Sequence, residues 1–270
     1  MRSGVLAVPA VEKAVQAVRK LWYAGRDERI ELGGHHLRYT PGTRPTRLKY
    51  RNDPDMIVRN DVRQLEFFCE NIAKGQTVVD VGANCGQYAV LFGALVGPGG
   101  RVIAFEPEQE SRSLMERNLS INKLSSRVTV EPFAVFDENG ERDFFVRSGD
   151  NMSSLERAGF GTNADASDIE GLTVQTVTLD EYFAANALPN PHWIKIDAEG
   201  AEVNVLRGAA RALHGETKIV CELHPYAWHS FGTSYGELLG MVQRAGRDIR
   251  FLDADRHISD GPEYGAVVIT

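Results

Sequence analysis

Cysteine is scarce in this sequence, which holds three in 270 residues: Cys69, Cys85 and Cys221. Their wide spacing fits neither the disulfide framework of a small secreted domain nor the closely paired ligands of a zinc site. The scarcity therefore favours a reducing compartment, and we expect a cytoplasmic protein.

Long apolar runs are missing as well. No stretch approaches the roughly 18 residues that a membrane-spanning helix needs. Residues 1–20 lack an apolar segment followed by a cleavage site. We therefore expect neither a membrane span nor a signal peptide.

Basic residues are outnumbered by acidic ones, 30 against 37, which gives a formal net charge of -7. This balance argues against a surface built for phosphate backbones. The local exception is a basic cluster, Arg44, Arg47, Lys49 and Arg51. Such a run is most often a solvated loop, and the alternative is a rim that attracts an anionic substrate.

The chain does have enough apolar residues, 43%, to bury one sizeable core. Residues 1–60 are predicted to form an N-terminal extension, with an amphipathic helix at 9–24 and a hairpin around Gly33 and Gly34. Residues 61–270 are predicted to form the main domain. Because the helix could pack on this domain or on a second subunit, a homodimer stays open.

From residue 61 onward, strands alternate with helices. The predicted strands are at 77–81, 101–107, 127–135, 172–177, 193–197, 218–223, 248–252 and 264–270, and the predicted helices at 61–74, 86–97, 110–124, 178–183, 201–213 and 235–246. This alternation indicates a parallel sheet with helices on both faces. The last two strands are joined by a loop too short for a helical crossover, so they are expected to be antiparallel.

The predicted fold class is therefore α/β: a doubly wound, Rossmann-like, mostly parallel seven-stranded sheet with an antiparallel last strand. A polar stretch at 137–171 interrupts the alternation and is interpreted as an insertion with one strand, at 141–146. Because it is rich in Ser, Gly, Asn and Asp, the rest of the insertion is expected to be loop.

The turn after the first strand of such a fold usually forms the ligand site, and here it lies in VVDVGANCGQYAV, residues 78–90. Gly82 permits a sharp turn, Gly86 a close approach of the next helix, and Asn84 tolerates a left-handed backbone. A dinucleotide fingerprint would need glycine at 84 and 87, where the chain has Asn84 and Gln87. The loop therefore disfavours a pyrophosphate, and with it a nicotinamide oxidoreductase.

The next strand ends at Glu106, where a carboxylate can accept hydrogen bonds from both hydroxyls of a ribose. Together with the loop, this suits a nucleoside that carries no pyrophosphate. S-adenosylmethionine meets that description. Asp80 either serves its cationic amino group or caps loop amides, and both interpretations stay open.

These residues carry a family resemblance. DVGANCGQY, FEP, the stretch 134–137, TLDEYF and WIKIDAEGAEVNVLRGA resemble the FkbM family of S-adenosylmethionine-dependent methyltransferases over roughly residues 61–225. The resemblance implies the class I methyltransferase fold. It also implies methyl transfer to oxygen, typically a hydroxyl of a sugar, glycolipid or polyketide-like natural product, so natural product biosynthesis is one expected setting.

The resemblance implies a cofactor site from matching positions. The predicted cofactor residues are Asp80, Gly82, Ala83, Asn84, Gly86 and Tyr88 around the methionine part, Glu106 and Pro107 at the ribose, Phe133 and Ala134 at the adenine, and Asp197. The family often carries an acid before the first strand, and Asp61 stands at that position here as the shorter Asp.

The part of the site that binds the methyl acceptor, called the acceptor side below, needs a base or a metal, because an alkyl hydroxyl is a poor nucleophile. The predicted catalytic residues lie at the ends of the fourth and fifth strands: His224, Asp197, Glu199, Lys195 and Glu222. His224 is the preferred base because its ordinary pKa is near neutrality, with a structural histidine as the alternative. Glu199 is preferred to Glu202, and Lys195 could simply pair with Asp197 beneath the site.

A divalent metal is a less favoured alternative. Asp197, Glu222 and His224 could bind one, but they are spread over separate strands and their spacing does not demand an ion. The predicted substrate residues are Asn151, Ser153 and Ser154 in the insertion, with Tyr226 and Trp228 either stacking on a sugar ring or packing the loop.

Two other functions stay open. An RNA methyltransferase would explain the basic run 44–51, although the net acidity argues against nucleic acid as a partner. A non-catalytic scaffold that binds S-adenosylmethionine would keep Gly82 and Glu106 but not the acceptor side. The expected partner is a small-molecule or glycosidic hydroxyl acceptor.

Overall fold

The structure is a computed structural model of the chain that describes residues 27–45, 55–147, 153–156 and 169–270. Several predicted features lie outside the described residues: the helix at 9–24, Arg47, Lys49 and Arg51 of the basic cluster, and Asn151. Arg44, the described member of that cluster, pairs with Glu28 at 2.9 Å.

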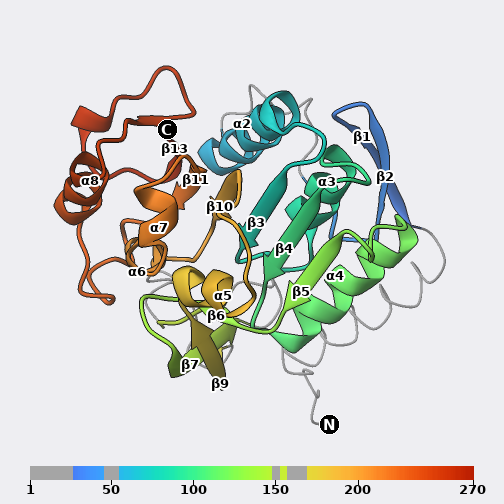
Figure 1. Cartoon of the computed structure of the whole chain (residues 1–270), viewed down its shortest axis with the longest axis horizontal. Helices are drawn as coiled ribbons and strands as arrows, with labels where there is room; N and C mark the ends of the chain where they lie inside the picture. The colour runs from blue at the N-terminus through green and yellow to red at the C-terminus, as the bar shows by residue number, and fades with distance from the viewer. Residues whose placement is uncertain (1–26, 46–54, 148–152, 157–168) are drawn as a thin grey trace, which may run out of the picture.

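The predicted N-terminal hairpin is confirmed. Strands β1 (Glu28–Leu32) and β2 (His35–Tyr39) pair antiparallel across Gly33 and Gly34. Tyr39 is fully buried and donates its hydroxyl proton to the carbonyl of Gln87 at 3.0 Å. The hairpin is thereby attached to the main domain beside helices α3 (Gln87–Leu95) and α4 (Gln109–Ile121) (Figure 1).

The predicted mixed sheet of seven strands is present (Figure 1), but the strand expected at 172–177 is not part of it and lies in a second sheet. The seven strands are β3 (Thr77–Val81), β4 (Arg101–Phe105), β5 (Val128–Glu131), β10 (Trp193–Ile196), β11 (Lys218–Leu223), β12 (Ile249–Phe251) and β13 (Gly265–Ile269). They lie in the order β12-β13-β11-β10-β3-β4-β5. The pairs from β11 to β5 are parallel, and β13 is antiparallel to both of its neighbours.

Helices cover both faces of this sheet, as a doubly wound fold requires. One face packs with α2 (Met56–Asn71), α3 (Gln87–Leu95) and α4 (Gln109–Ile121), and the other with α5 (Leu179–Ala185), α6 (Glu202–Arg207), α7 (Ala210–Leu213) and α8 (Tyr235–Arg244). Alternate residues of each central strand enter the two cores, because successive side chains point to opposite faces. Val78 packs in the first core and Val79 in the second.

Two predicted helices have different limits. The helix expected from residue 61 begins at Met56, where the Asp55 side chain accepts a hydrogen bond from the Ile57 amide. The helix expected at 201–213 is divided into α6 and α7. A turn of 3₁₀ helix, Ile258–Asp260, lies in the loop before the last strand.

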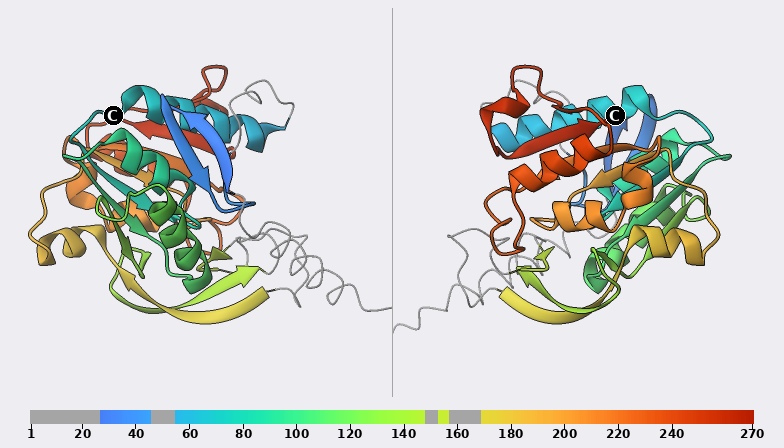
Figure 2. Two further views of the ribbon diagram at one scale, coloured as in Figure 1. Left: turned by 90° about the vertical axis from the view of Figure 1, so that its right-hand side faces the viewer. Right: turned by 60° about the vertical axis from the view of Figure 1, so that its left-hand side comes forward.

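The largest difference from the prediction is a second, four-stranded sheet. Its strands are β6 (Ala134–Val135), β7 (Gly140–Arg147), β8 (Ser153–Ser154) and β9 (Ile169–Val177), in the order β6-β9-β7-β8. The single strand expected at 127–135 is split around Pro132, which cannot donate a ladder hydrogen bond. Figure 2 shows β7 and β9 below the main sheet in both views. The described residues of the polar stretch, 137–147, 153–156 and 169–171, are therefore mostly strand. Ala134 on β6 and Ser153 and Ser154 on β8 line the cavity of the main domain.

Candidate active site

A cavity of about 700 Å³ lies over the carboxyl ends of the parallel strands, where open α/β sheets bind ligands. Most of the predicted site residues line it: Gly82, Ala83, Asn84, Tyr88, Glu106, Pro107, Phe133, Ala134, Ser153, Ser154, Lys195, Asp197, Glu199, Glu222, His224 and Tyr226. Asp61 lines it too. Asp80, Gly86 and Trp228 do not.

The loop after β3 has the backbone that its sequence suggested. Gly82 has φ 73°, and a Cβ atom at this position would lie 1.9 Å from the carbonyl oxygen of Asp197. Asn84 is left-handed with φ 49°, and its side chain accepts a hydrogen bond from the Cys85 amide at 2.6 Å. Gly86 lies behind the cavity, where its close neighbour is Met115 of α4. Its closeness to Met115 supports a role in helix packing, and the expected cofactor contact stays a prediction.

Glu106 is buried at the tip of β4 and is held by the loop. Its two carboxylate oxygens accept hydrogen bonds from the amides of Asn84 and Glu108, each at 2.8 Å. Burial raises the pKa of Glu106 to about 7, against the opposing effect of these amide donors. Each oxygen keeps a further lone pair, so the carboxylate can still accept hydrogen bonds from ligand hydroxyls.

Lys195 and Asp80 form a buried pair beneath the cavity. Asp80 is 0% exposed, and neither of its carboxylate oxygens has a hydrogen-bond partner among the described residues. Lys195 Nζ lies 3.8 Å from Asp80 Oδ1 and 3.2 Å from Asp197 Oδ2. Burial raises the pKa of Asp80 to about 6, opposed by Lys195. Asp80 therefore does not cap loop amides, which corrects that interpretation. It does not line the cavity, and a role toward the amino group of the cofactor stays a prediction.

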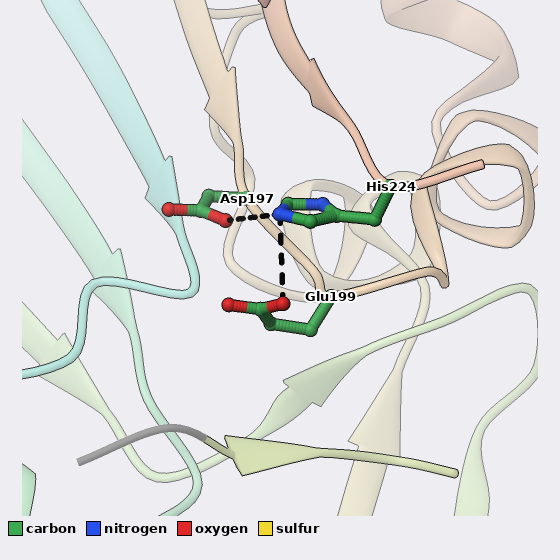
Figure 3. A group of neighbouring side chains, drawn as sticks. All are labelled: Asp197, Glu199 and His224. Atoms are coloured by element: carbon green, nitrogen blue, oxygen red, sulfur yellow. Dashed lines mark ion pairs between the residues drawn. The ribbon is translucent and has the colours of Figure 1, made fainter. Parts of the chain in front are cut away.

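His224 is held between three carboxylates. Its Nδ1 lies 2.8 Å from Glu202 Oε1, and its Nε2 lies 3.5 Å from Glu199 Oε2 and 4.0 Å from Asp197 Oδ1 (Figure 3). Burial by itself lowers the pKa of His224, but Glu199, Glu202 and Asp197 outweigh it and raise the pKa well above its usual value. The three carboxylates therefore favour the protonated form of the ring, and a protonated ring cannot accept the proton of an acceptor hydroxyl.

Glu202 is the residue that sequence reasoning undervalued. It is fully buried and accepts hydrogen bonds from the Gly200 amide at 2.7 Å and from Trp228 Nε1 at 2.6 Å, besides its contact with His224. Trp228 is 3% exposed, so it packs the loop and cannot stack on a sugar. The sequence does place Glu202 in the first turn of a predicted helix. Acids are common in the first turn of exposed helices, so this position did not indicate a buried site residue.

Glu222 has its own set of partners. Asn60 Nδ2 donates to it at 3.0 Å, Gln64 Nε2 at 2.7 Å, and the Tyr264 hydroxyl donates as well. These donors attach α2 and the loop before β13 to the end of β11. The acids that group with His224 are therefore Asp197 and Glu199, which replaces the predicted set of Asp197, Glu222 and His224.

Ser153, Ser154, Phe144, Tyr226 and Tyr264 also line the cavity. Tyr226 is 52% exposed, and its hydroxyl donates to Glu199 Oε2 at 3.3 Å. Ser154 donates to the backbone carbonyl of Glu199 at 3.1 Å. Both contacts are made to the same acid, Glu199.

The charge of the lining is strongly acidic. The carboxylates are Asp61, Glu106, Asp197, Glu199 and Glu222, against the two basic residues Lys195 and His224. No arginine is among the described residues that line it. Burial raises the pKa of Glu199 to about 7, and neighbouring carboxylates oppose the lowering effect of His224. Such a site favours a cationic ligand over an anionic one.

The parallel sheet with an antiparallel last strand, the helices on both faces and the cavity over the strand ends define a class I methyltransferase fold. Residues 80–249 match the family described as Methyltransferase FkbM domain. This match covers more than half of the chain, and the chain therefore belongs to the FkbM methyltransferase family.

One relative is the hexuronic acid methyltransferase AglP of Haloferax volcanii, which is 22% identical over 198 residues, or 72% of this chain and 73% of that protein. Similar solved structures include fibrillarin from Aeropyrum pernix with natively bound S-adenosyl-L-methionine (TM-score 0.45, 10% identity, 92% of this chain and 85% of that chain). A SAM-dependent O-methyltransferase from Thermotoga maritima has TM-score 0.42 and 14% identity, with 93% and 79% covered. The family assignment rests on the sequence match.

None of the helices in the described part of the chain is long and apolar enough to cross a membrane.

Proposed function

We propose that this protein transfers the methyl group of S-adenosylmethionine to a hydroxyl oxygen of a saccharide or a related small molecule. The observation that carries the proposal is the composition of one cavity. The loop at Gly82 and Asn84 and the carboxylate of Glu106 line one side, and Glu199 and His224 line the other.

The cofactor is proposed to lie on the side of β3 and β4. Glu106 accepts hydrogen bonds from the two ribose hydroxyls, the loop at 82–84 faces the methionine part, and Phe133 and Ala134 frame the adenine. The acidic lining supports this placement, because S-adenosylmethionine carries a sulfonium and an ammonium group. The absence of glycine at 84 and 87 supports a ligand without a pyrophosphate.

The chemistry is an in-line displacement. The acceptor oxygen attacks the methyl carbon, the carbon–sulfur bond breaks, and the bonding electron pair leaves on sulfur as neutral S-adenosylhomocysteine. The hydroxyl proton passes to Glu199, which lines the cavity and whose pKa of about 7 is close to that of an efficient general base. Lys195 and His224 hold Asp197 and Glu199 in position, and a single cavity that binds both ligands aligns donor and acceptor.

A saccharide acceptor is supported by two points. The relative from Haloferax volcanii is named for a hexuronic acid, and the exposed ring of Tyr226 offers a surface on which a sugar ring can stack. An RNA acceptor is disfavoured because the acidic lining repels a phosphate backbone. A scaffold without activity does not account for the acids and the histidine on the acceptor side.

The test is calorimetric titration of the purified chain with S-adenosylmethionine, S-adenosylhomocysteine and NADH, beside an Asn84→Trp variant. We expect the first two to bind, NADH not to bind, and the variant to lose binding because the indole fills the cofactor side. Methyl transfer is then followed as S-adenosylhomocysteine formed with a panel of sugars, sugar acids and RNA. Binding of NADH alone, or methylation of RNA alone, contradicts the proposal.

A further inference from the structure

Three side chains able to ligate a metal ion meet at the acceptor side of the cavity. Asp197, Glu199 and His224 each present one ligand atom, and these atoms lie within 4.8 Å of one another. Figure 3 shows both carboxylates turned toward the same imidazole nitrogen, Nε2. The His224 side chain is only 5% exposed, so this nitrogen faces the cavity from a buried position.

The outer partners of these side chains hold them as a metal site requires. Glu202 Oε1 lies 2.8 Å from Nδ1 of His224, so a neutral ring would keep its proton on Nδ1 and leave the Nε2 lone pair for an ion. A carboxylate on the far nitrogen is the usual outer partner of a metal-ligating histidine. Lys195 donates to Asp197 Oδ2 at 3.2 Å, while Oδ1 is the oxygen turned toward His224.

The local charge also favours a cation here. Asp197, Glu199 and Glu202 converge on a single imidazole, and the cavity lining as a whole has more carboxylates than basic groups. Gathering carboxylates in a buried place is costly unless a cation compensates them. One ring proton supplies a single positive charge, and a divalent ion supplies two.

We propose that Asp197, Glu199 and His224 bind a divalent first-row transition-metal ion that holds the acceptor oxygens in front of the methyl donor. This inference rests on the proposed function and adds to it the chemistry that recognises the acceptor. A donor set of one imidazole nitrogen and two carboxylate oxygens suits Mn²⁺, Fe²⁺, Co²⁺ or Zn²⁺ better than Mg²⁺, which prefers oxygen ligands. Bonds of about 2.1 Å would draw the ligand atoms together by small side-chain movements.

The ion would select acceptors with two adjacent oxygens. Three protein ligands leave coordination positions open toward the cavity, and a vicinal diol or a hydroxy acid of a sugar can fill two of them. The ion lowers the pKa of the bound hydroxyl. Glu199 binds the ion through Oε2 and keeps Oε1 to accept the proton. The alkoxide then attacks the methyl carbon, and the electron pair of the carbon–sulfur bond leaves on sulfur.

Mn²⁺ is the probe, because its binding can be measured directly and does not depend on methyl transfer. The full chain is treated with EDTA, desalted and titrated with Mn²⁺ by calorimetry and by the loss of the free-ion electron paramagnetic resonance signal. We expect one ion per chain, and at least about tenfold weaker binding in each of Glu199→Gln and His224→Gln. Pulsed resonance of the bound ion is expected to show coupling to an imidazole nitrogen, which the His224→Gln variant loses.

The matched control is Glu106→Gln, which removes a charge from the opposite side of the same cavity. We expect it to keep Mn²⁺ binding and to bind S-adenosylmethionine only weakly, whereas Glu199→Gln should weaken Mn²⁺ binding and keep S-adenosylmethionine binding. The two measurements separate the metal inference from the proposed function. If Glu106→Gln weakens S-adenosylmethionine binding but the wild-type chain binds no Mn²⁺, the metal inference is wrong and the proposed function is unaffected. Circular dichroism and thermal melts of each variant verify folding. If a variant does not fold, the coupling of bound Mn²⁺ to an imidazole nitrogen in the wild-type chain still tests whether a histidine binds the ion.

Two outcomes overturn the proposal. One is the absence of saturable Mn²⁺ or Zn²⁺ binding to the wild-type chain, which would make His224 a protonated ring held by three carboxylates. The other is binding that both variants leave unchanged, because the ion would then lie elsewhere.

Discussion

Glu202 Oε1 and His224 Nδ1 lie 2.8 Å apart in the core of the candidate site, and neither side chain is exposed to more than a few per cent. The same carboxylate accepts hydrogen bonds from Trp228 Nε1 and from the Gly200 amide. Glu202 thus joins the turn after β10, the end of β11 and the loop that follows. The orientation of His224 toward the cavity depends on this buried acid.

We therefore expect Glu202→Gln to be strongly destabilising. A glutamine has one acceptor oxygen in place of two and turns an NH₂ group toward a donor. Hydrogen bonds to a charged group contribute about 1.5–3 kcal/mol each, so the free energy of unfolding should fall by about 3 kcal/mol in urea denaturation. Glu170→Gln is the control, because Glu170 is exposed on β9 and its change should stay within about 0.5 kcal/mol. Equal effects of the two variants would contradict this role of Glu202.

The role of Glu202 illustrates how far sequence reasoning reaches. The seven strands, their helices and the antiparallel end followed from apolar strands, alternating periodicity and one short loop. The tight turn followed from Gly82 and Asn84. Which acids turn inward did not follow. Spacing cannot distinguish an acid that is exposed at the start of a helix from one that is buried against a histidine, as Glu202 is.

The second sheet escaped prediction for a similar reason. β7 and β9 pair over many residues, yet the chain between them reads as polar loop. The sequence predicts strands at 141–146 and 172–177, but nothing in either segment indicates that the two pair with each other. A further local signal is Pro132, inside a segment that otherwise reads as a strand. A pairing between distant segments leaves little mark on either segment alone.

The pKa of Glu106 makes cofactor binding dependent on pH. Burial raises this pKa from 4.5 to about 7 in the free protein, and only the ionised carboxylate accepts hydrogen bonds from both ribose hydroxyls. Affinity for S-adenosylmethionine should therefore fall as pH falls below 7, with Kd about tenfold higher at pH 6 than at pH 8. Calorimetry at the two pH values measures this. Glu106→Gln should bind weakly with little pH dependence, and an unchanged tenfold slope in that variant would assign the effect to another group.

Lys195 is expected to be essential for stability. Its ammonium group is the cation facing Asp80, whose oxygens have no hydrogen-bond partner among the described residues. Lys195→Met leaves that carboxylate unpaired and should cost about 3–5 kcal/mol. Because the folded pKa of Asp80 already lies above its usual 3.8, at about 6, folding binds a proton between these values, and stability falls as pH rises through that window. Without Lys195 the pKa of Asp80 in the folded protein is higher still, so the pH range in which stability falls extends to higher pH.

The decrease in the free energy of unfolding caused by Lys195→Met should accordingly be smaller at pH 5 than at pH 8, as measured by urea denaturation. The double variant Lys195→Met with Asp80→Asn removes the unpaired charge and should recover part of the stability at pH 8. If the double variant is as unstable as the sum of the two single variants, the pair is not coupled and the explanation by charge is wrong.

The last prediction concerns the close approach at Gly82. A Cβ atom there would lie 1.9 Å from the carbonyl oxygen of Asp197, and φ is 73°. Gly75 has a similar φ of 84°, but a Cβ atom added to it meets nothing within 4 Å. Gly75→Ala therefore measures the cost of the left-handed backbone alone, about 1–2 kcal/mol. Gly82→Ala should cost at least about 3 kcal/mol, because the loop must also move away from Asp197. That movement should abolish S-adenosylmethionine binding in calorimetry, while Gly75→Ala binds normally; equal costs and intact binding in both variants would show that the contact with Asp197 does not fix the loop.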